Sequence, residues 1–194
     1  MRWGKYIFLL SALLLVLSSL VGYRHRYAYT IPNLPAPIAG EPVLVTTAGL
    51  GAEGLIVARM CSQLNLDYDY FFESTPYDLE GKKCLIVVLG VSPAGISSIY
   101  TTPGEEEKRI LKLVHFAVQQ HIPIIAVHLG GMDRRGGLND RLIEAVVPLA
   151  SYVLVAGDGD EDGIFTRLTR ARNIPLTEVA DINDLRIPLD SAFR

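Results

Sequence analysis

The chain has 194 residues, enough for one domain with a core of its own. Hydrophobic residues make up 49% of the sequence and charged residues 20%, a composition that excludes a disordered chain. The net charge is −3 and the basic residues are scattered, so the composition gives no reason to expect nucleic acid as a partner.

The first predicted element is a hydrophobic helix at the N-terminus. Arg2 and Lys5 precede an apolar run at residues 6–23, which as a helix would span about 27 Å, close to the hydrocarbon thickness of a bilayer. We therefore expect residues 1–27 to form an uncleaved signal anchor that contacts the membrane through residues 6–23. A cleaved signal peptide is the alternative. Positive charge is nearly balanced across the run, so it leaves the orientation open.

A proline-rich segment follows and predicts an extended, semi-rigid tether at residues 28–41. The α/β domain is expected to occupy residues 42–194. The prolines that define the segment are Pro32, Pro35, Pro37 and Pro42.

From residue 43 onward, apolar β-branched runs alternate with helical patterns. Strand candidates occur at residues 43–49, 67–72, 84–90, 122–130, 151–157 and 174–180. Apolar residues recur at helical spacing over residues 55–64, 102–121, 138–147 and 164–171. Strands that are solidly apolar are covered on both faces. The pattern predicts a three-layer, doubly wound α/β sandwich, flavodoxin-like or Rossmann-like, with a mostly parallel sheet of five or six strands.

In such a sheet, ligands bind outside the carboxyl ends of the strands, where the strand order reverses. The turns that follow the predicted strands are therefore the places where function is expected. They are residues 48–54, 73–76, 90–95, 128–137 and 157–163.

The first of these turns contains GLGAEG, which matches G-x-G-x-x-G between a strand and a helix. Gly49 and Gly51 would let a pyrophosphate approach the backbone at the helix N-terminus. Glu73 lies at about the distance along the chain expected for a ribose-binding acid. A plain tight turn or a small-anion site requires the same glycines, and we favour these over nucleotide binding.

The segment GVSPA at residues 90–94 is close to a nucleophile elbow, with Ser92 in the place of the nucleophile. That elbow uses the backbone N–H of the next residue for its oxyanion hole. Here the next residue is Pro93, which has no N–H, so a hydrolase of this type is disfavoured.

The segment HLGGMDRRGG at residues 128–137 offers the richest chemistry of any turn. Arg134 and Arg135 could grip a carboxylate or phosphate bidentately. His128 could act as a general base or a metal ligand, with Asp133 close in sequence. The alternative is a hydrogen-bonded histidine at a strand end beside two solvated arginines.

The acidic segment GDGDEDGIF places Asp158, Asp160 and Asp162 as in the first half of a calcium loop. The bidentate glutamate that should complete such a loop is replaced by Thr169, so an EF-hand is excluded. A weak calcium site remains an alternative. We favour a helix start, in which Asp158 or Asp160 caps the helix. No other cofactor is expected, and the two cysteines, Cys61 and Cys84, are predicted to be buried thiols.

Several of these segments together resemble a known family. VLVTTAG, CLIVVLGVSPAGI, HIPIIAVHLGG, RRG, and GDEDGIF followed by NIPLTEV are similar to an uncharacterised bacterial family, domain of unknown function 6305 (DUF6305), over residues 41–179. Members of that family look exported, so the resemblance implies a single-pass membrane protein with its domain extracytoplasmic, or a protein secreted after signal cleavage. It implies no activity and no catalytic residue.

The leading functional hypothesis is a module that binds a small anionic ligand with its glycine-rich turns, Arg134 and Arg135. An enzyme that uses His128 with nearby carboxylates is an alternative from another class. A structural or interaction domain without a ligand is the third. The candidate ligand-binding residues are Gly49, Gly51, Ser92, His128, Asp133, Arg134, Arg135, Asp158 and Asp160.

Overall fold

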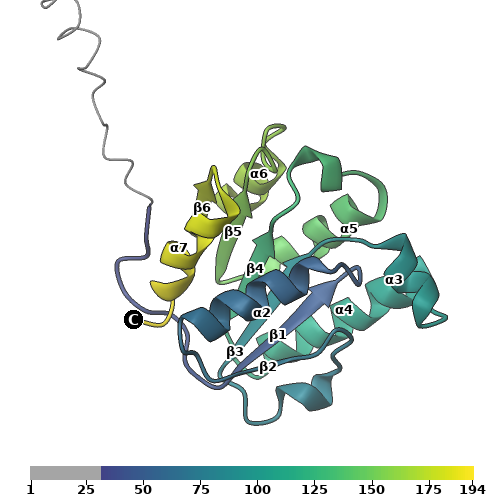
Figure 1. The fold of residues 1–194 in the computed structure, drawn as a ribbon, viewed down its shortest axis with the longest axis horizontal. Helices are drawn as coiled ribbons and strands as arrows, with labels where there is room; N and C mark the ends of the chain where they lie inside the picture. The colour runs from purple at the N-terminus through teal and green to yellow at the C-terminus, as the bar shows by residue number, and fades with distance from the viewer. Residues whose placement is uncertain (1–31) are drawn as a thin grey trace, which may run out of the picture. The chain divides into compact units, whose positions relative to one another are not determined.

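The computed structural model describes residues 32–194 (Figure 1). The predicted signal anchor and the start of the predicted tether lie outside the described residues. Within residues 32–194, no helix is both long enough and apolar enough to cross a bilayer.

The described part of the chain forms one parallel sheet of six strands in the order β2-β1-β3-β4-β5-β6. Each predicted strand is confirmed, with slightly tighter limits than the apolar run that predicted it. The strands are β1 (Val43–Ala48), β2 (Tyr68–Tyr70), β3 (Cys84–Leu89), β4 (Ile124–His128), β5 (Tyr152–Ala156) and β6 (Leu176–Val179). The first five positions of this order are those of a flavodoxin-like sheet.

The four predicted helices are confirmed as α2 (Glu53–Gln63), α4 (Pro103–Gln119), α5 (Gly137–Val146) and α6 (Ile164–Arg170). Two further helices, α3 (Pro93–Ser98) and α7 (Arg186–Asp190), are too short to show a hydrophobic period in the sequence. Short 3₁₀ helices complete the described residues: η1 (Pro76–Leu79), η2 (Met132–Arg134), η3 (Val147–Leu149) and η4 (Ile182–Leu185).

Helices cover both faces of the sheet and give it three layers (Figure 1). Apolar side chains of α4, α5 and α6 pack on one face, and those of α2, η4 and α7 pack on the other. Successive strand residues point to opposite faces, so in β1 Leu44 enters the first core while Val43 and Val45 enter the second. The predicted burial of both cysteines is confirmed, and burial raises the pKa of Cys61 to about 12.

The start of the described chain packs on the domain, although residues 28–41 were predicted to be a tether. The Leu34 N–H donates to Ser191 Oγ at 3.2 Å, and the N–H groups of Ile38 and Ala39 both donate to the Ala192 carbonyl at 2.9 Å. Thr177 Oγ1 donates to the Pro32 carbonyl at 3.1 Å. The N-terminal segment therefore meets the domain beside the end of α7.

A buried ion pair joins α4 to the carboxyl ends of β1 and β2. Glu106 is only 1% exposed, and its Oε1 accepts the N–H of Gly49 at 2.7 Å. Arg109 donates to both carboxylate oxygens of Glu106 at 2.7 Å, and also to the carbonyls of Thr47 at 2.7 Å and Ser74 at 2.8 Å. We call this arrangement the Glu106–Arg109 clamp. It was not predicted, because Glu106 lies within the charged run EEEK.

Breaking the clamp should strongly destabilise the fold. Glu106→Ala leaves the Arg109 guanidinium buried without its counter-ion, which we expect to lower the free energy of unfolding by about 3–5 kcal/mol. The adjacent Glu107→Ala is the matched control, since Glu107 makes only a partly exposed contact of 3.3 Å with Arg141 and should cost less than about 1 kcal/mol. Urea denaturation monitored by circular dichroism measures both, and equal effects of the two variants would contradict the clamp.

Candidate functional site

The strand order reverses between β1 and β3, which brings the turn at residues 49–54 beside the turn at residues 90–95. The two turns are joined by backbone contacts: Leu50 and Val91 form an antiparallel bridge, and the Ser92 N–H donates to the Gly49 carbonyl at 2.8 Å. Leu50 is 1% exposed and fills the space between the turns. The two turns of the switch point are therefore packed directly against each other.

The glycine cradle of GLGAEG is occupied by the carboxylate of Glu53. A Cβ added at Gly51 would lie 2.2 Å from Glu53 Oε2, and one at Gly90 would lie 3.1 Å from the same oxygen. Glycine at both positions thus makes room for an acidic side chain, in the space that a pyrophosphate would occupy in a dinucleotide fold. This geometry weighs against the nucleotide interpretation.

Arg134 reaches the switch point and pairs with Glu53, 81 positions away in sequence. Its Nε donates to Glu53 Oε1 at 2.7 Å, and its Nη2 contacts the same oxygen. The Arg134 side chain is 37% exposed, whereas that of Glu53 is 13% exposed. Within residues 32–194, Glu53 Oε2 is buried and has no hydrogen-bond partner. The predicted residue Arg134 thus lies at the expected edge, with a partner that the sequence did not indicate.

Arg135, by contrast, is fully engaged within the fold. Its side chain is 4% exposed, and its Nε donates to Asp140 Oδ1 at 2.8 Å. Its Nη1 donates to the Gly159 carbonyl at 2.7 Å, and its Nη2 to Asp162 Oδ2 at 2.9 Å. The guanidinium also lies 5.6 Å from the centre of the Phe165 ring. The hydrogen bond from Arg135 lowers the pKa of Asp162, so this carboxylate stays charged. The contacts give Arg135 a structural role.

His128 is buried at the end of β4, with both ring nitrogens facing backbone carbonyls. Its Nδ1 lies 3.1 Å from the Leu89 oxygen and its Nε2 lies 3.1 Å from the Gly131 oxygen. Burial lowers the pKa of His128, which favours the neutral ring, and a neutral ring can donate from only one nitrogen. This is the arrangement of a hydrogen-bonded strand-end residue, and it presents neither nitrogen to a substrate.

The three aspartates of the acidic segment each bind a different partner. Asp158 Oδ1 accepts the Met132 N–H at 3.0 Å, and Asp162 pairs with Arg135. Asp160 accepts the N–H groups of Phe165 at 2.6 Å and Thr166 at 2.9 Å, at the start of α6. Among the described residues, no group of three or more His, Cys, Asp or Glu side chains is placed to hold a metal ion. Asp160 thus satisfies first-turn amides of α6, as predicted for a helix start, although the N-cap position itself is Gly163 and Asp158 does not take part.

Two other predicted residues have simple local roles, and one polar residue was missed. Ser92 caps α3, since its Oγ accepts the Gly95 N–H at 3.0 Å, and Asp133 lies exposed on η2. Asn139 on α5 accepts the Val91 N–H at 2.7 Å and so ties α5 to the turn after β3. No sequence motif identifies Asn139, because the contact depends on how α5 meets β3.

A shallow hollow of about 430 Å³ lies at the carboxyl ends of β4, β5 and β6. It is lined largely by glycine backbone and short polar side chains. The lining residues are Leu129, Gly130, Gly131, Gly157, Asp158, Ala180, Asp181, Ile182 and Asn183. The hollow brings together two of the five predicted turns, residues 128–137 and 157–163, while the Glu53–Arg134 pair lies at the switch point of the same edge.

Comparison with known proteins gives a family and no activity. A family model described as "Domain of unknown function (DUF6305)" matches residues 40–193. No curated protein matches the sequence. Among solved structures, AlinE4, an SGNH-hydrolase family esterase, is similar at 9% identity and a TM-score of 0.30, covering 74% of this chain and 77% of that one. A mutant of AlinE4 is similar at 10% identity and a TM-score of 0.31, with the same coverage. At these TM-scores the likeness carries no argument.

The acidic segment should contribute to stability as a helix start. Asp160→Ala removes the acceptor of two first-turn amides, which we expect to lower the free energy of unfolding by about 0.5–2 kcal/mol. Glu161→Ala is the matched control, because Glu161 is exposed and precedes the same helix. Thermal unfolding of the full-length chain measures both.

The calcium alternative predicts a different response in the same assay. If the aspartates only cap and pair, millimolar calcium or a chelator leaves the melting temperature unchanged. A calcium-dependent rise that disappears in Asp158→Asn with Asp162→Asn would contradict the helix-start interpretation.

Proposed function

The chain belongs to the DUF6305 family, and we propose that this member binds a small anionic ligand at the switch point of its sheet, through Arg134 and Glu53. The observation that carries the proposal is the Glu53–Arg134 pair, which combines a partly exposed arginine side chain with a buried carboxylate oxygen that has no hydrogen-bond partner among residues 32–194. In doubly wound sheets, ligands bind at this position.

The unused polar groups of the pair define the chemistry of the ligand. Arg134 directs its Nε and Nη2 at Glu53, which leaves Nη1 for a second anion. An unsatisfied buried oxygen such as Glu53 Oε2 costs about 1–3 kcal/mol, so a donor on the ligand would be favourable there. A carboxylate or phosphate that also carries a hydroxyl or amino group meets both requirements.

The acids Asp140 and Asp162 at the same edge are engaged by the buried Arg135 and not by Arg134. The single charge of Arg135 offsets one of these two carboxylates, and Arg134 is left to meet the ligand. The two arginines therefore have different roles in this proposal, whereas the sequence suggested that Arg134 and Arg135 bind the ligand together.

Ligand binding should depend on Arg134 and not on Arg135. Thermal shift of the full-length chain with inorganic phosphate, citrate, lactate and glutamate tests the class, since a ligand at a hundred times its Kd adds about 2.7 kcal/mol to stability. Arg134→Ala should abolish the ligand-dependent shift, and it should also lower the unliganded melting temperature, because it leaves the Glu53 carboxylate without its counter-ion. Arg135→Ala should lower the unliganded melting temperature further, because it removes two ion pairs of a buried guanidinium, but it should keep the ligand-dependent shift.

Arg172→Ala serves as the matched control, because Arg172 is exposed and distant in sequence from the pair. A ligand-dependent shift that persists in Arg134→Ala would show that the anion binds elsewhere.

We further propose that the domain is held on the extracytoplasmic side of a membrane by a hydrophobic anchor at residues 6–23. The length of this apolar run supports the proposal, as does the absence of a good cleavage site after it. A tethered domain of this kind would meet ligands outside the cytosol. Secretion after cleavage is the alternative.

Fractionation of the native cells distinguishes the two. We expect the full-length chain to remain in the membrane pellet after a carbonate wash, since an anchor of this length is not removed by high pH. Deletion of residues 6–23 should release the protein. A processed soluble species that begins near Tyr23 would favour the secreted alternative.

A further inference from the structure

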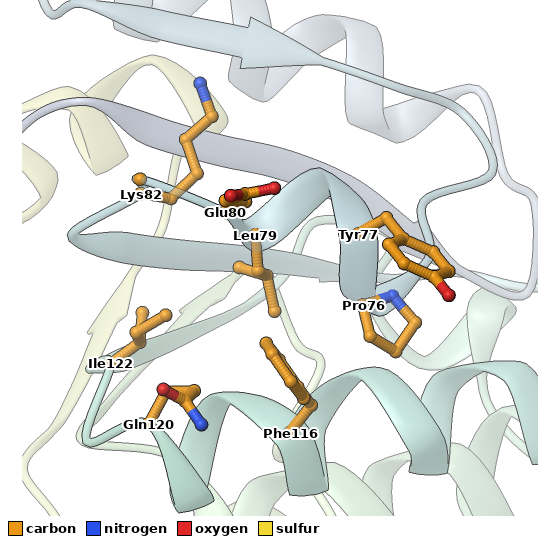
Figure 2. A pocket seen from close by; sticks show the side chains of 9 residues that line it. Pro76, Tyr77, Leu79, Glu80, Lys82, Phe116, Gln120 and Ile122 are labelled. Atoms are coloured by element: carbon orange, nitrogen blue, oxygen red, sulfur yellow. The ribbon is translucent and has the colours of Figure 1, made fainter.

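A second candidate site is a hollow at the opposite edge of the sheet from the Glu53–Arg134 pair. It has a volume of about 690 Å³ and lies between η1 and the C-terminal half of α4 (Figure 2). Its lining includes Lys82, just before β3, and Ile122, just before β4, which places it at the amino ends of these strands. Its size is that of a small-molecule site.

Apolar side chains converge in this hollow. Leu79 points down from η1 and Phe116 points up from α4, with Ile122 beside them (Figure 2). Pro76 adds a ring from η1, and Tyr77 lies at the margin with 89% of its surface exposed. A large aromatic residue left exposed next to an apolar hollow is typical of a binding surface.

A second hollow of about 390 Å³ extends this surface toward the start of α4. It also lies against η1, and Pro76 lines both hollows. Four residues that line the two hollows are four positions apart along α4 and its C-cap, so neighbouring members lie on the same face of the helix. They are Lys108, Lys112, Phe116 and Gln120. The two hollows therefore form one groove, which we call the η1–α4 groove.

Free positive charge is concentrated at one end of the groove. Within residues 32–194, neither Lys108 nor Lys112 has a carboxylate within ion-pair distance. Arg109, which also lines this end, is held by Glu106, and the carboxylate of Glu105 is held by the N-cap residue Thr102. At the other end, Lys82 is paired with Asp69.

From these observations we propose that the η1–α4 groove binds an amphipathic carboxylate. The apolar body of the ligand, an aromatic ring or a short hydrocarbon chain, would cover Phe116 and Ile122, which are both partly exposed. Its carboxylate would lie near Lys112, one helical turn from Phe116, or near Lys108, one turn further. The site is separate from the one that uses Arg134, and neither proposal depends on the other.

A photoaffinity probe tests the groove in the full-length chain. The probe is para-benzoylbenzoate, an aromatic carboxylate that cross-links on illumination, and its uncharged methyl ester is the control probe. We expect saturable labelling by para-benzoylbenzoate, mapped by mass spectrometry to peptides that contain residues 74–82 and 108–122. Labelling by the ester should reach half-saturation only at a higher concentration.

Variants of the two lysines measure how much their charge contributes to the binding of the probe. Lys108→Gln with Lys112→Gln should raise the half-saturating concentration of para-benzoylbenzoate about three- to tenfold, as expected for ion pairs with two exposed lysines, and should leave that of the ester unchanged. Arg170→Gln with Arg172→Gln is the matched control, since it removes two exposed charges near the end of α6 and should change neither probe.

The apolar wall has its own variants. Phe116→Ser should weaken the binding of both probes, but Phe116 also packs against the core. Tyr77→Ser changes the exposed margin of the groove and leaves the core intact, so it should weaken the binding of both probes without a loss of stability. Arg134→Ala should leave labelling unchanged. Labelling that maps outside the groove, equal affinity for acid and ester, or no effect of the lysine variants would each overturn the proposal.

Discussion

The carboxyl edge of this sheet depends on one buried ion pair, the Glu106–Arg109 clamp. Burying both charges is costly, and the cost is offset only because each is fully hydrogen-bonded. Glu106 uses its oxygens for Arg109 and the Gly49 amide, while Arg109 also binds the carbonyls of Thr47 and Ser74. The pair thereby fixes where β1 ends and how the turn after it begins. Glu53, the acidic residue of the switch point, follows directly from that turn.

The position of Glu53 follows from this turn. The clamp holds Gly49, and two residues later Gly51 leaves room beside its Cα, which the Glu53 carboxylate fills. The fold has thus placed a fixed negative charge where related architectures place a ligand phosphate. That charge draws Arg134 to the edge, and the pair leaves polar groups partly unsatisfied. A pairing that is incomplete within the described residues is the physical reason for expecting a ligand there and not at Arg135.

The sequence predicted the architecture well because the four central strands are buried on both faces and the long helices show a clear hydrophobic period. The sequence did not predict α3 and α7, because each helix is too short to show a hydrophobic period. The carboxyl edge could be predicted from topology, but the pairing of Arg134 with Glu53 could not, since it joins residues 81 positions apart. The role of Glu106 could not be predicted from the sequence, because its burial depends on tertiary contacts. The η1–α4 groove was missed since only turns after strands were searched.

Helix α4 takes part in both candidate sites, yet the contacts argue against communication through it. Coupling between sites requires an element with two alternative arrangements. Arg109 lines the basic end of the groove, but all its donor nitrogens are already directed at Glu106, Thr47 and Ser74. A ligand above Lys112 would therefore meet a guanidinium whose three nitrogens are already hydrogen-bonded within the fold. The clamp acts as a fixed support shared by the two sites, and each site is expected to bind its ligand independently.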